Sequence, residues 1–271
     1  MRQWTIDAFA MRPFEGNSAC VVEPLDAWPS ADWMQALARE NNAGATAFLM
    51  QGEASHRFAL RWFTPAVEVP LCGHATLAAA HALFAHARLD AADLEFQTAS
   101  GLLKVRRDGG GYAMAFPSQP SRSIPAPQGL GEALGVEPQE VWAGAYLVAL
   151  LGSAGEVRAV EPKLDQLRTI SLELGGQGNV GIAAVAPPTA DFDVIDRFFA
   201  PGYGIPEDAA TGSFHCILTP IFARKLGRQR LRFHQASPGR GAHLEGRLID
   251  GGVMISGCAC TILESVLQTH P

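Results

Sequence analysis

Two stretches of the sequence place side chains capable of acid and base chemistry at the start of an apolar helix. The first is PLCGHATLAAAHALF at residues 70–84, and the second is PEDAATGSFHCILTPIFARKLG at residues 206–227. A thiol, an imidazole and a carboxylate can each take up and release a proton, so both stretches indicate proton-transfer chemistry. The polar residues at these starts are Cys72, His74 and Thr76 in the first stretch, and Asp208, Thr211, Ser213 and His215 in the second.

The first backbone amides of a helix have no partner within the helix and bind anions without the help of a lysine or arginine. A carboxylic acid held there has its carboxylate stabilised, and the same amides stabilise the enolate that forms when the adjacent C–H loses its proton. We therefore expect a small carboxylic acid as substrate, with His74 and Ser213 in one cleft. The predicted substrate-binding residues are Gly73, Ala75, Thr211, Gly212 and Ser213, and the predicted catalytic residues are Asp208, His74 and Cys72.

Each predicted catalytic residue also has a purely structural interpretation. Cys72 can be a small core residue, because most buried cysteines are. His74 can hydrogen-bond a neighbouring backbone group, and Asp208 can cap the turn that follows it. The helix N-terminus favours the reactive thiolate at Cys72, and a histidine in the first turn of a buried helix is costly unless it is used.

Three landmarks of the first half recur in the second half in the same order. FTP at 63–65 matches FAP at 199–201, Gly73 matches Gly212, and LEFQTASG at 94–101 matches LRFHQASPG at 231–239. Ordered recurrence at similar spacing indicates duplication of one unit, although accidental similarity of two β-α-β segments is the alternative. Residues 75–85 are apolar around nearly the whole helix, which predicts a sheet curled around a buried helix in each half.

The rest of the chain supplies short strands and a second clear helix. We expect strands near residues 4–8, 20–22 and 47–50, and a helix that begins after Ser30 and stops at Asn42 or Gly44. In the second half, Pro220 should kink its helix or end the first turn. GQGNVG at 176–181 fits a dinucleotide-binding pattern, but a helix precedes it and a strand follows it, so we interpret it as a glycine-rich helix end.

Composition excludes several classes of function. The 271 residues are 48% hydrophobic and carry a net charge of −6, without the basic surface that nucleic acid requires. No apolar run reaches the ~18 residues of a membrane span, and we expect a cytoplasmic protein. The five cysteines are too scattered for zinc, and His81 and His86 lack a partner at metal spacing, so we expect thiols and no metal site.

The sequence resembles the PhzF-like family of phenazine biosynthesis, relatives of diaminopimelate epimerase and proline racemase. The resemblance runs from IDAFAMRPFEGNSACVV through RWFTPAVEVPLCGHATLAAAHAL and FFAPGYGIPEDAATGS to ISGCACTILES. It implies an α+β fold of two pseudo-symmetric domains, each a barrel-like sheet around a central helix, with no cofactor and a homodimer. The Pro-rich stretch after residue 115 places the domains at 1–115, with 256–271 returning to it, and 116–255.

By this resemblance, His74, Asp208 and Ser213 fall on active-site positions of the family. Cys72 falls where the epimerases keep one of their two catalytic thiols, and the second thiol is absent because the matching turn reads DAATG. The family's principal acid and base is a glutamate in a stretch resembling Asn-Leu-Ser-Glu-Thr-Ala-Phe. The corresponding stretch here is NAGATAF at 42–48, so Ala45 stands in the place of that glutamate.

The sequence is compatible with two functions. The first is a cofactor-independent isomerase or epimerase that moves a proton on a small carboxylic acid through Asp208, His74 and Cys72. The second is a non-catalytic protein that binds a small acid at the same helix starts. Cys72 favours the first function because it offers a titratable group, and Ala45 favours the second.

Overall fold

The protein is described by a computed structural model that covers residues 1–269. The chain forms two compact units, the first comprising Met1–Ala115 and the segment from Ser256 onward, and the second comprising Phe116–Ile255. It passes from the first unit to the second within strand β8 (Gly111–Pro117) and returns within strand β17 (Gly252–Gly257). One unit is therefore discontinuous in sequence and the other is continuous.

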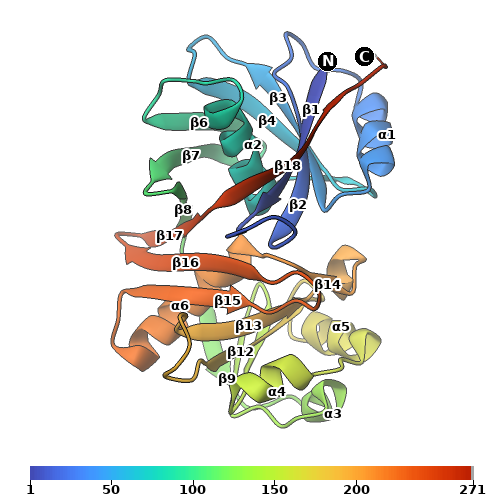
Figure 1. Ribbon diagram of the computed structural model, residues 1–271. Helices are drawn as coiled ribbons and strands as arrows, with labels where there is room; N and C mark the ends of the chain where they lie inside the picture. Colours follow the sequence, from blue (N-terminus) through green and yellow to red (C-terminus); the bar gives the residue numbers. More distant parts are fainter. Residues whose placement is uncertain (270–271) are drawn as a thin grey trace. The chain divides into compact units, whose positions relative to one another are not determined.

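The first unit combines strands with two helices, and Figure 1 shows helix α2 lying among its strands. Besides β8, its elements are β1 (Arg2–Ala8), β2 (Asn17–Val22), α1 (Ala31–Asn41), β3 (Ala45–Gln51), β4 (Arg57–Phe63), β5 (Glu68–Val69), α2 (Gly73–Ala85), β6 (Asp93–Thr98), β7 (Gly101–Asp108) and β18 (Ala259–Val266).

The second unit adds three further helices, α3, α4 and α5, whose apolar residues share one core cluster with strands β10 to β13. Its elements are β9 (Ser121–Ile124), α3 (Leu130–Leu134), β10 (Glu140–Gly144), β11 (Leu147–Leu150), α4 (Ala154–Ala159), α5 (Leu164–Glu173), β12 (Val180–Val185), β13 (Val194–Phe199), the 3₁₀ turn η1 (Pro201–Tyr203), β14 (Glu207–Asp208), α6 (Gly212–Leu226), β15 (Arg230–Gln235) and β16 (Ala242–Ile249).

The two units repeat one strand topology, as the three sequence landmarks predict. In the first unit, β1 and β2 are antiparallel, β2 and β3 parallel, and β3 and β4 antiparallel; β4 then pairs with short β5 and runs parallel to β6, which is antiparallel to β7. In the second unit, β10, β11, β12, β13, β14, β15 and β16 follow the same series of pairings. Helix α2 follows β5 and helix α6 follows β14, so the duplicated unit includes its central helix.

Local sequence signals determine where the helices of the first unit begin and end. The hydroxyl of Ser30 accepts a hydrogen bond from the Trp33 amide at the start of α1, and Asn42 ends that helix in the left-handed conformation, with φ 47°. Helix α2 is buried along almost its whole length and packs on β1, β2 and β3. Its predicted extent, 75–85, is confirmed, with two more residues at the start.

Helix α6 carries Pro220 in its interior, which excludes one of the two expected effects, an early end to the helix. The helix does not end at this residue but continues to Leu226. A proline in a helix interior removes one backbone hydrogen bond, and the burial of the flanking Thr219 and Ile221 offsets that loss. Close packing of this helix is visible at Gly181 of β12, where an added Cβ would lie 2.1 Å from Cζ of Phe214.

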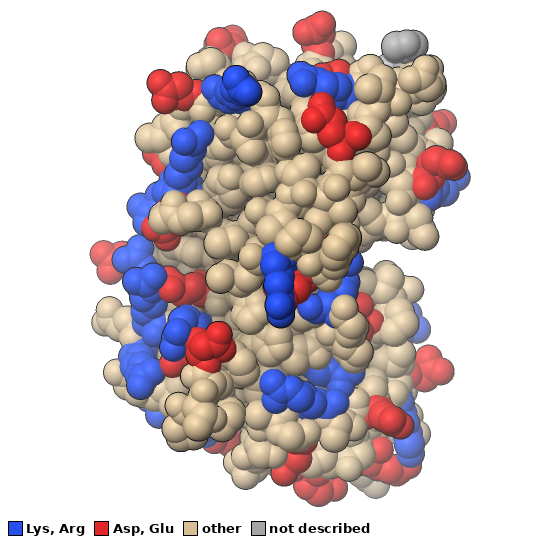
Figure 2. All heavy atoms as spheres, in the orientation of Figure 1, with Lys and Arg blue, Asp and Glu red and all other residues tan. Residues whose placement is uncertain are grey.

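The surface carries both signs of charge. Figure 2 shows acidic side chains interspersed among the basic ones on the face in view. Some of the protein's charged side chains form ion pairs; Arg57 and Lys104, for example, both contact Glu95. Within residues 1–269, none of the helices combines the length and apolar character needed to cross a membrane.

Candidate active site

The start of α2 brings Cys72 and His74 together with Asn17. Cys72 Sγ lies 3.5 Å from Nδ1 of His74, and Asn17 Nδ2 lies 3.4 Å from the same ring nitrogen. His74 and Asn17 are buried, whereas Cys72 is half-buried. With Asn17 donating to Nδ1, the neutral imidazole carries its proton on Nε2. A thiol and an imidazole in contact form a pair that can hold and transfer one proton.

Two glycines determine the surroundings of this pair. Gly16 has a φ of 65°, and an added Cβ would lie 2.1 Å from the carbonyl oxygen of Ala8, so only glycine turns the chain into Asn17. At Gly44, an added Cβ would lie 2.7 Å from Oδ1 of Asn17 and 3.3 Å from Nε2 of His74. Ala45 follows directly as the first residue of β3 and is 1% exposed. The position next to His74 is therefore occupied by small residues.

In the second unit, the carboxylate of Asp208 is held by residues at the start of α6. Strand β14 pairs Asp208 with Phe198, and Oδ2 of Asp208 accepts a hydrogen bond of 2.6 Å from the Thr211 hydroxyl. The buried side chain of Gln235 accepts from the Thr211 amide at 2.8 Å and donates to the Asp208 carbonyl at 2.7 Å. Its amide also donates to the Thr211 hydroxyl at 3.2 Å, so that hydroxyl must direct its own proton to Asp208. This network fixes the direction of the carboxylate.

His215 belongs to the interior and not to the group of polar residues at the helix start. Its ring is fully buried, with Nδ1 2.8 Å from the carbonyl oxygen of Thr211 and Nε2 3.3 Å from Oδ2 of Asp196. A carbonyl only accepts hydrogen bonds, so Nδ1 carries a proton. His215, itself in contact with Asp196, therefore holds the carbonyl of Thr211 in place. The acid–base role that the sequence suggested for His215 does not fit its complete burial.

Ser213, in the first turn of α6, contacts a tyrosine. Its hydroxyl is 2.9 Å from that of Tyr146, which is 2.9 Å from that of Tyr203. Tyr203 donates in turn to Oε1 of Gln177 at 3.0 Å. Ser213 is half-buried and Tyr146 only 5% exposed, so the chain of hydroxyls leads inward from the helix start before it reaches the surface at Tyr203.

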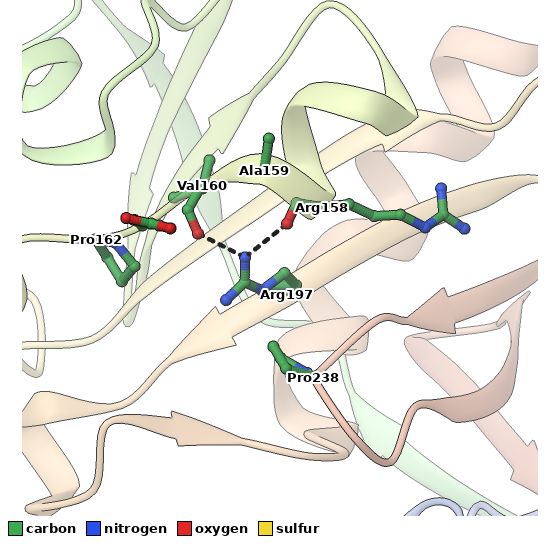
Figure 3. A pocket seen from close by; sticks show the side chains of 7 residues that line it. Arg158, Ala159, Val160, Pro162, Arg197 and Pro238 are labelled. Carbon is green, nitrogen blue, oxygen red and sulfur yellow. Dashed lines mark hydrogen bonds between the residues drawn. The ribbon is translucent and has the colours of Figure 1, made fainter.

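A pocket elsewhere in the second unit has a structural explanation. The pocket has a volume of about 600 Å³ and is lined by residues 158–162, Arg197 and Pro238. Figure 3 shows these side chains. The Arg197 guanidinium donates to the carbonyl of Val160 at 2.8 Å and makes a two-pronged ion pair with Glu207. Arg197 thus joins the end of α4 to β14, the strand that carries Asp208. None of the predicted site residues lines this pocket.

Other sequence motifs take structural roles. GQGNVG follows the end of α5 and its last two residues begin β12; the glycine of positive φ that ends the helix is Gly175, directly before the motif. All five cysteines are thiols. His81 and His86 both contact the Thr261 hydroxyl, and no cluster within residues 1–269 gathers three or more His, Cys, Asp or Glu side chains in an arrangement that could hold a metal ion.

Sequence reasoning missed three residues that organise the site. Gln235 had a usable signal, because it follows Leu231 and Phe233 on the buried face of β15 and is the polar member of that series. Asn17 had a weaker signal, its position directly after a glycine that needs a positive φ. Tyr146 had none, because its contact with Ser213 depends on the fold that joins residues 67 positions apart.

Comparison with solved structures defines the class of protein. A PhzF-family protein of Enterococcus faecalis has a TM-score of 0.91 and 33% identity, with 98% of this chain and 99% of that chain covered. A structure from Pseudomonas aeruginosa named as a predicted epimerase has the same fold, with a TM-score of 0.73 and 24% identity over 99% of both chains. The fold is therefore that of the epimerase-like proteins, two pseudo-symmetric units each with a central helix.

Sequence comparison then identifies the family. The sequence model of the phenazine biosynthesis-like proteins matches residues 6–265. An uncharacterized isomerase of Pseudomonas aeruginosa is 40% identical over 264 residues, which cover 97% of each chain. The chain belongs to the phenazine biosynthesis-like family, and its relatives and fold are of the isomerase and epimerase type.

Proposed function

We propose that the protein is a cofactor-independent isomerase or epimerase that moves a proton on a small carboxylic acid. Asp208 and His74 serve as acid and base groups, and Cys72 adds a third titratable group. The observation that carries this proposal is the 3.5 Å contact between Cys72 Sγ and His74 Nδ1 at the start of a central helix. Such a pair can accept a proton and return it, which supplies a function that Ala45 does not.

The proposed reaction has two proton transfers. A base removes the proton from the carbon next to the carboxylate, and the electron pair of the broken C–H bond moves into the carboxylate as an enolate. Backbone amides at a helix start stabilise this charge. A protonated group then returns one proton, to the opposite face of the same carbon in an epimerisation or to another carbon in an isomerisation. That the two helix starts serve one substrate stays a prediction.

A non-catalytic acid-binding protein is the second candidate. It is favoured by Ala45, a methyl group where the resemblance places the family's glutamate. General acid and base groups contribute about 10²–10⁴-fold to rates, so their loss can leave binding without turnover. A binding protein would keep the helix starts and lose the exchange of protons.

Solvent deuterium exchange separates the two candidates. The protein is incubated in D₂O with a panel of amino, hydroxy and cyclic carboxylic acids, and incorporation at carbon is followed by NMR. For the isomerase we expect exchange at a carbon next to the carboxylate of one acid, with rates reduced about 10²-fold or more in Asp208→Asn and in Cys72→Ala.

Cys258→Ala is the matched control, because it removes a thiol between β17 and β18 that lies near Tyr112, which stacks on Phe84 in the last turn of α2, and it should leave the rate unchanged. Saturable binding of an acid without any exchange would show a binding protein. Full exchange in Cys72→Ala would remove the thiol from the mechanism and leave the acid–base work to Asp208 and His74.

A further inference from the structure

Four residues of the second unit form a continuous hydrogen-bonded chain that ends at Ser213. From the surface inward, the order is Gln177, Tyr203, Tyr146 and Ser213, with successive distances of 3.0, 2.9 and 2.9 Å. The members come from the segment before β12, the turn η1, the loop between β10 and β11, and the first turn of α6. Three hydroxyl groups in series must share three protons in a definite order.

The carbonyl oxygen of Gln177 determines that order. It can only accept a hydrogen bond, so Tyr203 donates to it, and Tyr203 then has no proton left for its other neighbour. Tyr146 must therefore donate to Tyr203. Because the one hydroxyl proton of Tyr146 is directed at Tyr203, Ser213 must donate its own proton to Tyr146. The Ser213 oxygen keeps its two lone pairs as acceptors for a group that lies at the helix start.

Packing and acid–base chemistry both keep this order in place. Tyr146 is 5% exposed and meets Phe198 edge to face at 4.9 Å between ring centroids, and Phe198 lies 5.1 Å from Phe214. Removal from water, and then the neighbouring Tyr146, raise the pKa of the Tyr203 phenol. Although half of the Tyr203 side chain is exposed, its hydroxyl thus stays protonated and continues to donate.

We propose that Tyr146 is a positioning residue that makes Ser213 a hydrogen-bond acceptor, so that the site selects carboxylic acids carrying a donor group, a hydroxyl or an amine, opposite Ser213. Acids with a keto or ether oxygen at that place are disfavoured, because two acceptors then face each other. The inference rests on the proposed function for the location of the substrate beside Ser213. It goes beyond that function by naming which small carboxylic acids the site takes.

Neutron diffraction on deuterated crystals tests the proton order without any ligand. We expect the Ser213 deuterium between its oxygen and that of Tyr146, and the Tyr146 deuterium directed at Tyr203. A Tyr146 deuterium directed at Ser213 would overturn the proposal. Because no substrate is involved, this result holds whether or not the protein proves to be an isomerase.

Ligand binding tests the consequence for selectivity. Dissociation constants are measured by NMR titration for 2- and 3-hydroxybenzoate and for the matching methoxybenzoates. In wild type, we expect a hydroxy acid to bind about tenfold more tightly than its ether. In Tyr203→Phe, Tyr146 loses its acceptor and donates to Ser213, so Ser213 presents a proton to the ligand and the ratio shifts toward the ether.

Tyr112→Phe is the matched control. Tyr112 contacts His81 in the first unit, so loss of its hydroxyl should leave the ratio as in wild type. Every variant is tested with the same pairs of ligands, so the bulk of the extra methyl group cancels in the comparison. An identical ratio in wild type and Tyr203→Phe would contradict the proposal. If none of these acids binds, the neutron result alone decides it.

Discussion

Gln235 shows how a residue distant in sequence can determine the geometry of a local motif. Thr211 and Asp208 are three residues apart, and their contact could be expected from the turn before a helix. The direction of the shared proton is determined by Gln235, which the register of β13 and β15 brings to this turn. The polar groups at the helix starts could be predicted from the sequence because each group stands directly before or within the start of an apolar run. It could not identify partners that depend on strand register.

Ala45→Glu tests whether the site beside His74 still suits the carboxylic acid, a ring compound, that the family resemblance implies as substrate. By resemblance, the family reaction moves a proton between carbons of a dihydro-hydroxyanthranilate ring. If the site accepts this acid, the added carboxylate should raise its isomerisation by about 10²-fold or more over wild type. Turnover is followed by the change in ultraviolet absorbance of the ring.

Ala45→Gln is the control for this experiment, since it adds the same volume without an ionisable group. Position 45 is 1% exposed, so circular dichroism must first show that both variants fold. A folded Ala45→Glu protein as inactive as Ala45→Gln would exclude this ring compound as a substrate of the site.

At the scale of elements, the duplication was predictable and the additions to it were not. The recurring FTP and FAP landmarks mark the ends of β4 and β13, and the recurring glycines mark the starts of α2 and α6. These landmarks are short motifs that lie at strand ends and helix starts, so they can be recognised from the sequence alone. The extra helices of the second unit required the structure: α3 precedes β10, and two helices, α4 and α5, lie between β11 and β12 where the first unit has α1 alone between β2 and β3.

The approach of β12 to α6 gives a prediction at this scale. Gly181→Ala should destabilise the protein by about 1–3 kcal/mol, because its Cβ would lie 2.1 Å from the Phe214 ring. Urea unfolding monitored by circular dichroism measures the loss. Gly110→Ala, where an added Cβ meets nothing within 4 Å, should change stability little.

A second substitution checks the cause of this effect. Phe214→Leu removes the ring that the new methyl group would strike, so the double variant should lose less stability than the sum of the two single variants. Additive losses would show that Gly181 is needed for some reason other than contact with Phe214.

At the scale of the whole molecule, stability should depend on pH through His81. Burial, and then the nearby His86, lower the pKa of His81 from 6.5 to about 4. The unfolded chain therefore takes up this proton at a higher pH than the folded chain does. The resulting stability is present above about pH 6.5 and decreases as the pH falls toward 4, by about 2 kcal/mol at pH 5.

Urea unfolding at neutral pH and at about pH 5 measures this effect in wild type and in His81→Gln. The variant should lose less stability on acidification, since it has no proton to take up at this position. His56→Gln, a substitution outside the helices and strands, is the control and should behave like wild type. Equal acid sensitivity in wild type and His81→Gln would contradict the prediction.

Because the first unit is discontinuous in sequence, the two units can complete their folding at different times during synthesis. Strand β1 pairs along its length with β18, from Arg2 opposite Val266 to Ala8 opposite Ala259. During synthesis, the strands from β9 to β16 leave the ribosome before β18 does. The second unit can therefore fold while the first unit still lacks β18. Until then one edge of β1 has no partner, and an unpaired edge is a site for pairing with another chain. A chain whose translation stops within β18 would therefore have a folded second unit and a first unit that exposes an unpaired edge of β1 to other chains.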